Sequence, residues 1–301
     1  MHEPGEWLAK YQRAGEAHDV SKMKELEKQI FLETVDLVTI GRYTSVSGRE
    51  ITFPDPSFLI KNSVLYDSPI KLGDCSISHE TEYAVVNQDC LLAGRNLREE
   101  GFDPIVLNMA NQFKPGGGVI HGDRAQEESI FRRSNIFLSL YQFAPYARKY
   151  GLKPRMQQYP MADRYGGAYS PNVIVFRGER SEGYPLLDDP YVLSFVTVAA
   201  LCNPELTFTG HLTAPDLEET RKRAETILRI ALSNGHDAIV LSAWGCGAFH
   251  NPPADIARLF HEALESPDFK GRFKKVVFAI IGDHHAQTLG DKFEAFQREF
   301  E

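Results

Sequence analysis

The sequence predicts an α/β protein with three layers, in which helices cover both faces of a central sheet. The first observation is a set of apolar runs of strand length without polar alternation, for example residues 104–110 and 192–199. The second is that segments with helical spacing of apolar residues separate these runs, for example residues 217–233. Strands that are apolar on both sides must be buried on both sides, so each face of the sheet needs a helical layer.

The N-terminal residues 1 to about 70 are expected to form an extension that packs on the main domain, residues 71–301. Within the extension, residues 19–41 combine loosely helical apolar spacing with many charges, which predicts an amphipathic helix. Residues 52–68 contain Pro54 and Pro56 and are expected to form an extended connector.

The main domain then alternates between strands and helices. Strands are expected at residues 83–87, 104–110, 172–176, 192–199, 238–243 and 275–281. Helices are expected at residues 91–100, 126–140, 217–233 and 253–264. In such sheets ligands bind beyond the carboxyl ends of the strands, so the loops that follow strands are the first places to search for a site.

The composition fits a globular protein that does not bind nucleic acid non-specifically. The chain has 301 residues, 43% of them hydrophobic and 25% charged, with a net charge of -8 and a pI of about 5.7. Without a basic field, an anionic ligand must be bound locally, by backbone N–H groups or a few arginines. The polar N-terminus and the lack of a run of about 20 apolar residues lead us to expect a cytoplasmic protein without membrane contact.

The first candidate site lies in residues 108–129, NMANQFKPGGGVIHGDRAQEES, where a buried strand ends and a helix begins. Gly116, Gly117 and Gly118 have no Cβ, so this loop can adopt positive φ and approach a ligand closely. Successive N–H groups in such a loop can form a concave anion site. Neither GxGxxG nor the Lys-Ser/Thr ending of a P-loop is present, which disfavours a dinucleotide or NTPase site. A flexible glycine turn is the structural alternative.

Two adjacent carboxylates, Glu127 and Glu128, follow Gln126 at the expected start of the next helix. They could simply interact favourably with the positive end of the helix dipole. They also come shortly after the glycines, so the loop can fold with the helix start facing the anion site. A carboxylate beside bound phosphates would tend to keep the proton that a general acid needs. The residues alone leave both interpretations open.

The three glycines, seven residues and then Gln126-Glu127-Glu128 resemble the signature of poly(ADP-ribose) glycohydrolases. The surroundings resemble the bacterial-type branch, including Asn108 and Asn111, Pro115, Ala125, Arg132-Arg133-Ser134 and the segment YGGAYSPNVIVFR at residues 165–177. The resemblance covers about residues 35–281 and implies a macrodomain with a mixed central sheet. It also implies hydrolysis of the ribose–ribose O-glycosidic bond to release ADP-ribose, with no cofactor and no metal.

On this hypothesis Glu128 is the catalytic acid/base, which protonates the leaving oxygen and then takes a proton from the attacking water. Glu127 is expected to orient a hydroxyl of the ribose or of the leaving group. Arg132 and Arg133 could neutralise phosphates, or they could pair with acids on their own helix.

A second glycine loop, SAWGCGAFHNPP at residues 242–253, also follows a buried strand and precedes a helix. Gly245 and Gly247 leave room for N–H groups to point at an anion, and Asn251 is expected near the N-cap of the helix. Two such loops at neighbouring strand ends could grip a diphosphate between them. Phe249 could offer an aromatic face to the terminal ribose, as the resemblance implies, or it could belong to the core.

The adenine end of the ligand is assigned to Asp89, which follows a short strand. The resemblance implies that Asp89 bonds the adenine amino group, and the alternative is an acid at a helix start. The full set of residues expected to bind substrate is Asp89, Asn108, Asn111, Gly116, Gly117, Gly118, Val119, Gln126, Gly245, Cys246, Gly247, Ala248 and Phe249.

The four cysteines are scattered, with no CxxC pair and no Cys/His cluster, so we expect neither a zinc site nor a disulfide framework. Cys246 is expected to be a small residue tolerated beside glycines and not a nucleophile, because no base can be paired with it.

The expected partners are ADP-ribose or poly(ADP-ribose) and ADP-ribosylated targets, and two alternatives stay open. One is a mono-ADP-ribosyl hydrolase that acts on modified protein, nucleic acid or a small ADP-ribosyl metabolite. The other is a non-catalytic macrodomain that binds ADP-ribose, which would not need residues 126–128. A purely structural domain would need neither the glycine loops nor the adjacent carboxylates.

Overall fold

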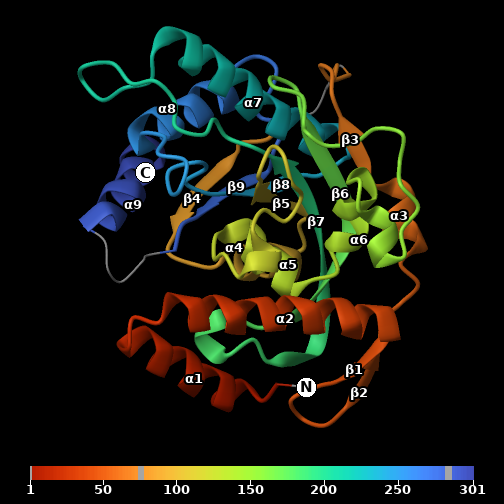
Figure 1. The fold of residues 1–301 in the computed structure, drawn as a ribbon. Coiled ribbons are helices and arrows are strands. Elements are labelled where there is room, and N and C mark those ends of the chain that lie inside the picture. The colour runs from red at the N-terminus through yellow and green to blue at the C-terminus, as the bar shows by residue number, and fades with distance from the viewer. Residues whose placement is uncertain (1, 74–77, 282–286) are drawn as a thin grey trace. The chain divides into compact units, whose positions relative to one another are not determined.

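A computed structural model describes residues 2–73, 78–281 and 287–301, without the side chains of residues 287–291 (Figure 1). The chain divides into two compact units, which are described separately. Unit 1 consists of Met1–Ser63, Phe113–Tyr159 and Ser170–Val192, and unit 2 consists of Val64–Gln112, Pro160–Tyr169 and Leu193–Glu301. The expected boundary near residue 70 stays a prediction.

A seven-stranded sheet has the strand order β3–β6–β7–β5–β8–β9–β4. Its strands are β3 (Val64–Tyr66), β4 (Glu82–Val86), β5 (Pro104–Met109), β6 (Gly167–Arg177), β7 (Leu186–Val198), β8 (Ala238–Leu241) and β9 (Lys275–Ala279). The pairs β7–β5, β5–β8, β8–β9 and β9–β4 are parallel, whereas β3 is antiparallel to β6. The sheet is therefore mixed, as expected.

Unit 2 has helices on both faces of its strands (Figure 1). On one face α7 (Ala214–Ser233), α8 (Pro253–Leu264) and α9 (Gln287–Phe300) share a core with the strands, in which Phe260, Phe278 and Phe296 are buried. On the other face α4 (Cys90–Glu99) approaches closely, since a Cβ on Gly94 would lie 2.8 Å from Cγ2 of Val106. This arrangement confirms the predicted three-layer α/β/α architecture.

Unit 1 is built around a pair of N-terminal helices, α1 (Pro4–Glu16) and α2 (Val20–Ile40). The Asp19 side chain accepts the N–H of Lys22 at the start of α2, and Gly41 with φ 84° ends it, which confirms the helix expected at residues 19–41. The other elements are β1 (Arg42–Thr44), β2 (Glu50–Thr52), α3 (Ser57–Asn62), α5 (Gln126–Arg133), α6 (Phe137–Leu140) and the 3₁₀ turns η1 (Val119–His121), η2 (Tyr141–Phe143), η3 (Ala147–Tyr150) and η4 (Arg180–Glu182).

Two local predictions are wrong. The connector expected at residues 52–68 contains α3 and β3, because Pro56 occupies the N-cap of α3 and does not interrupt it. The single helix expected at residues 126–140 is broken at Ser134, whose extended backbone forms a bridge with Val175. The bridge partner, Val175, belongs to the neighbouring strand β6, and helix propensity along the chain cannot predict such a long-range bridge.

No helix in the described part of the chain combines the length and the apolar character that a membrane span requires.

Candidate active site

The two adjacent carboxylates lie in the first turn of α5, where backbone N–H groups have no partner within the helix. Ala125 is the N-cap residue and Glu128 is the third residue of the helix. Oε2 of Glu128 accepts the N–H of Ala125 at 2.9 Å, as the glutamate of a capping box does. The start of the helix thus fixes one oxygen of Glu128.

The glycine loop fixes the other side of the carboxylate pair. The N–H of Gly118 donates to Oε1 of Glu128 and the N–H of Gly116 donates to Oε1 of Glu127, both at 2.9 Å. From the sequence, these N–H groups were expected to form an anion site for a ligand. In the structure the anions that these N–H groups bind are the protein's own carboxylates. Hydrogen bonds therefore connect the glycine loop directly to the start of α5.

Glycine is required in this loop because the backbone adopts positive φ and lies against the carboxylates. Gly116 and Gly117 have φ values of 79° and 52°. A Cβ on Gly117 would lie 2.3 Å from Oε1 of Glu128 and 3.2 Å from Oε2 of Glu127. A Cβ on Gly116 would lie 2.7 Å from the ring of Phe131. A flexible turn would not need these close approaches, so the structural alternative does not account for the loop.

The buried Tyr159 and the half-buried Tyr146 interact electrostatically with Glu127, and neither was expected from the sequence. Glu127 and Glu128 are 2% and 6% exposed. Burial, and next the charge of Glu127, raises the pKa of Tyr159. Burial and the charges of Tyr150 and Glu127 also raise the pKa of Tyr146, whose hydroxyl donates to the carbonyl of Pro115 at 3.4 Å. The signal that could have found them is the run of tyrosines between the QEE motif and β6.

The second glycine loop, in unit 2, is held in shape by Asn251. Its Nδ2 donates to the carbonyl oxygens of Leu201 (2.8 Å), Gly245 (3.2 Å) and Phe249 (3.3 Å). The expectation that Asn251 caps the next helix is wrong, because Pro252 is the N-cap residue of α8 and no side chain caps it. The amide of Asn251 fixes the shape of the loop, because it donates to three carbonyl groups of the turning chain.

Open N–H groups lie at the tip of this second loop. Among the described residues, the N–H groups of Gly247, Ala248 and Phe249 have no protein acceptor. Gly247 and Ala248 are exposed, and a Cβ on Gly247 would meet nothing within 4 Å. Three successive unpaired N–H groups before a helix are suited to an anion. Phe249 is half-buried and packs against the core of unit 2, which is the alternative considered for it.

Cys246 is a buried thiol and not an activated one. Burial raises the pKa of Cys246 to about 12, so the side chain is protonated at neutral pH. This supports the prediction of a small residue tolerated beside glycines. Cys90 is buried and Cys202 is exposed, and Cys75 lies outside the described residues.

The remaining expected residues occupy strand ends and helix starts. In unit 2, Asp89 is the N-cap of α4, and its Oδ1 accepts the N–H groups of Leu91 (3.1 Å) and Leu92 (3.2 Å), so the helix-start alternative is observed. Asn108 is buried in β5 and donates to Oγ1 of Thr197 at 3.3 Å, and Asn111 is half-buried beyond that strand.

In unit 1, two more of the expected residues lie beside the carboxylate pair along the chain. Val119 is buried in η1, directly after the glycines. Gln126 opens α5 and is half-buried. Both therefore belong to the same loop and helix start as Glu127 and Glu128.

The family model "Microbial-type PARG, catalytic domain" matches residues 32–178. Among solved structures, the poly(ADP-ribose) glycohydrolase of Thermomonospora curvata is 31% identical, with a TM-score of 0.75, over 91% of this chain and 99% of that chain. The same protein bound to the inhibitor ADP-HPD gives 31% identity and a TM-score of 0.73 over the same shares. The poly(ADP-ribose) glycohydrolase of Deinococcus radiodurans in complex with ADP-ribose is 29% identical, with a TM-score of 0.62, over 83% of this chain and 98% of that chain. A comparison with curated proteins gave no match.

The mixed sheet between helical layers, with glycine loops after its strands, defines a protein of the macrodomain class. The QEE segment lies within the residues that the family model matches. The chain belongs to the family of bacterial poly(ADP-ribose) glycohydrolases.

Proposed function

We propose that this chain hydrolyses the ribose–ribose O-glycosidic bond of poly(ADP-ribose) and releases ADP-ribose, with Glu128 as the acid/base. The family supports the reaction. The choice of Glu128 is supported by its two hydrogen bonds: Oε1 accepts the N–H of Gly118, and Oε2 accepts the N–H of Ala125. A carboxyl held on both sides presents its oxygens in a fixed direction, which proton transfer requires.

The reaction needs one proton to move in each direction. Glu128 protonates the oxygen that leaves C1″ of the terminal ribose, and positive charge develops on the ring as the bond breaks. Water then adds to C1″ and returns a proton to Glu128. Glu127, bound to the N–H of Gly116, is proposed to orient a hydroxyl of the ribose or of the leaving group.

The other proposed contacts are with the ADP-ribose unit. Phosphate oxygens are proposed to bind along residues 245–249, because the N–H groups of Gly247, Ala248 and Phe249 have no protein acceptor in the described chain. Asp89 is proposed to bond the adenine amino group, and Phe249 to contact a ribose. The remaining proposed substrate-binding residues are Asn108, Asn111, Gly116, Gly117, Gly118, Val119 and Gln126. ADP-ribosylated proteins are the proposed natural targets.

The test is the Glu128→Gln variant, which keeps the shape of the side chain but cannot donate an acid proton. We expect ADP-ribose release from poly(ADP-ribose) to fall by about 10²- to 10⁴-fold. We expect ADP-ribose binding, measured by calorimetry, to stay within about threefold, because the proposed contacts with the phosphates and the adenine do not involve Glu128.

Parallel assays on a mono-ADP-ribosylated protein separate the polymer hydrolase from the mono-ADP-ribosyl hydrolase. Turnover of polymer by the Glu128→Gln variant at the normal rate would show that the acid/base is another residue. A wild-type protein that binds ADP-ribose but releases none from either substrate would be a reader.

A further inference from the structure

The seven residues that join the glycines to the QEE motif, loop 119–125, pack against the N-terminal helices within unit 1. Gly122 has φ 79°, and a Cβ there would collide with the carbonyl of Lys24 in α2. Nζ of Lys24 lies 2.8 Å from Oδ1 of Asp123. Arg124 in the same loop donates to the hydroxyl of Tyr11 in α1. Both helices of the N-terminal pair therefore contact the loop that precedes the catalytic glutamate.

A buried ion pair lies beneath this loop. Arg132 of α5 and Glu27 of α2 are 1% and 0% exposed, and Nε of Arg132 lies 3.1 Å from Oε2 of Glu27. The same oxygen accepts the hydroxyl of Tyr184 at 2.8 Å. Arg132 was considered a phosphate ligand or a partner of acids on its own helix. Its partner instead comes from a helix about 100 residues earlier in the chain.

The guanidinium of Arg132 joins three segments. Nε also donates to the carbonyl of Glu27 at 3.0 Å, and Nη2 donates to the carbonyl of Asp123 in the loop. Burying two charges is costly unless each is paired and hydrogen-bonded, and breaking such a pair costs far more than a surface contact does. The pair therefore fixes α2, α5 and loop 119–125 in one arrangement.

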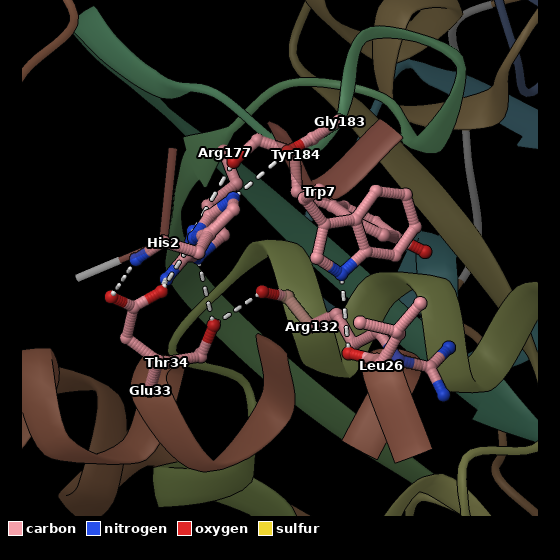
Figure 2. Close-up of polar contacts among 9 residues, drawn as sticks. All are labelled: His2, Trp7, Leu26, Glu33, Thr34, Arg132, Arg177, Gly183 and Tyr184. Atoms are coloured by element: carbon pink, nitrogen blue, oxygen red, sulfur yellow. Dashed lines mark hydrogen bonds and ion pairs between the residues drawn. The ribbon is translucent and has the colours of Figure 1, made fainter. Parts of the chain in front are cut away.

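A second contact holds the same stretch of α5 from its backbone side. The carbonyl of Arg132 accepts the Thr34 hydroxyl at 2.5 Å, and Nε of Arg177 donates to the same hydroxyl at 3.0 Å (Figure 2). Nη2 of Arg177 pairs with Glu33 of α2 at 2.8 Å. Helix α2 thus binds both the side chain and the main-chain carbonyl of Arg132 in α5.

Hydrogen bonds connect loop 119–125 to the carboxylate of Glu128. The N–H of Asp123 donates to the carbonyl of Gly118 at 3.2 Å. The N–H of Gly118 donates to Oε1 of Glu128 at 2.9 Å. A continuous series of contacts therefore runs from Glu27 through Arg132, Asp123 and Gly118 to Glu128.

We propose that the N-terminal helix pair is a positioning element for catalysis, in which Glu27 acts through Arg132 and loop 119–125 to set the carboxylate of Glu128. This inference rests on the proposed role of Glu128 as the acid/base. Residues 4–40 are then part of the catalytic apparatus, although none of them reacts with the substrate.

The first test is the Glu27→Gln variant, which preserves shape and a hydrogen-bond acceptor but removes the charge that fixes Arg132. We expect kcat for ADP-ribose release to fall by at least about 10-fold, because misplacement near 1 Å is sufficient for such losses. We expect KM and the Kd for ADP-ribose to change by less than about twofold.

The matched control is Tyr43→Phe, which removes a hydrogen bond of unit 1 away from the loop and the buried pair. The Tyr43 hydroxyl donates to the carbonyl of Leu187 at 2.8 Å, so this variant is expected to lose thermal stability and keep its kcat. An equal loss of kcat in both variants would show that general loosening, and not positioning, is responsible. A folded Glu27→Gln protein with wild-type kcat would overturn the proposal.

The second test is a double-mutant cycle with Glu128→Gln. If Glu27 acts only through Glu128, adding Glu27→Gln to the Glu128→Gln variant leaves the residual rate unchanged. Independent, multiplicative losses would reject the series of contacts. Turnover at the normal rate by Glu128→Gln alone would refute the proposed function, whereas an inactive Glu128→Gln with a fully active Glu27→Gln would refute only the positioning role.

Because Glu27 is fully buried, a third variant covers the case in which Glu27→Gln does not fold. Gly122→Ala pushes loop 119–125 away from the carbonyl of Lys24 and leaves the buried pair intact. We expect the same fall in kcat at unchanged KM, and wild-type kcat in this folded variant would count equally against the proposal.

Discussion

Replacing Gly117 by alanine tests whether the glycine loop sets the positions of Glu127 and Glu128, the two carboxylates proposed for catalysis. The new Cβ would lie 2.3 Å from Oε1 of Glu128, whereas ordinary van der Waals contact begins at 3.4 Å. The carboxyl oxygen or the loop must therefore move by the difference, 3.4 − 2.3 = 1.1 Å. A misplacement of about 1 Å near a reacting group can reduce a rate by about 10²-fold, so we expect a loss of that size in kcat.

The backbone strain of this substitution needs its own control, because Gly117 has φ 52°. Gly151, in the same unit, has φ 72°, and a Cβ there would meet nothing within 4 Å. Gly151→Ala therefore carries the left-handed strain of about 1–2 kcal/mol without any collision. We expect it to lower the free energy of unfolding by that amount and to leave kcat unchanged.

The assay compares initial rates of ADP-ribose release at saturating poly(ADP-ribose), by chromatography, with urea unfolding of each variant. We expect a catalytic defect only in Gly117→Ala and a similar strain cost in both variants. A Gly117→Ala protein with kcat within twofold of wild type would refute the close packing of glycine and carboxylate. Equal catalytic losses in both variants would attribute the effect to strain alone.

Three further predictions concern the pH dependence of stability, thiol reactivity and adenine binding. Burial by itself would raise the pKa of Glu33, but the hydrogen bond from His2 and the charge of Arg177 lower it from 4.5 to about 2. The stabilisation, reduced by solvent screening of this half-buried group to about 1–2 kcal/mol, is present above pH 4.5 and lost as the pH falls toward 2. Urea unfolding at a series of pH values should therefore show a flatter profile for Glu33→Gln. At neutral pH iodoacetamide should label exposed Cys202 much faster than buried Cys246, as peptide mass spectrometry can show, and rapid labelling of Cys246 would contradict its raised pKa. Asp89→Ser keeps an N-cap oxygen, so we expect stability within about 0.5 kcal/mol and, if the carboxylate bonds adenine, ADP-ribose binding weaker by about 10-fold or more. Unchanged calorimetric affinity would restrict Asp89 to helix capping.

Local signals predicted many of the elements. Helix α8 runs from Pro253 to Leu264, the bounds that its apolar spacing and N-terminal proline predicted. Helix α2 begins after Asp19 and ends at Gly41, because a side-chain cap and a left-handed glycine are encoded at those positions. The apolar strands were also predicted from local sequence, because a strand that is buried on both faces must be apolar throughout.

Long-range pairing decided what the sequence analysis missed. The predicted helix at residues 126–140 breaks because Ser134 pairs with Val175 of β6. Asn251, expected at a helix start, instead donates to a carbonyl 50 residues earlier, that of Leu201. Neither partner is visible in the local sequence, so propensity alone favoured a longer helix and a conventional cap.

For the site, the sequence by itself determined which groups are available: three glycines, two adjacent carboxylates and a second glycine loop. Only the tertiary structure decided how they are used. The N–H groups of Gly116 and Gly118 bind Glu127 and Glu128, and Arg132 pairs with Glu27 of a distant helix. The physical reason is that spacing along a chain encodes local geometry, whereas hydrogen bonds and buried ion pairs depend on which segments folding brings within reach of each other.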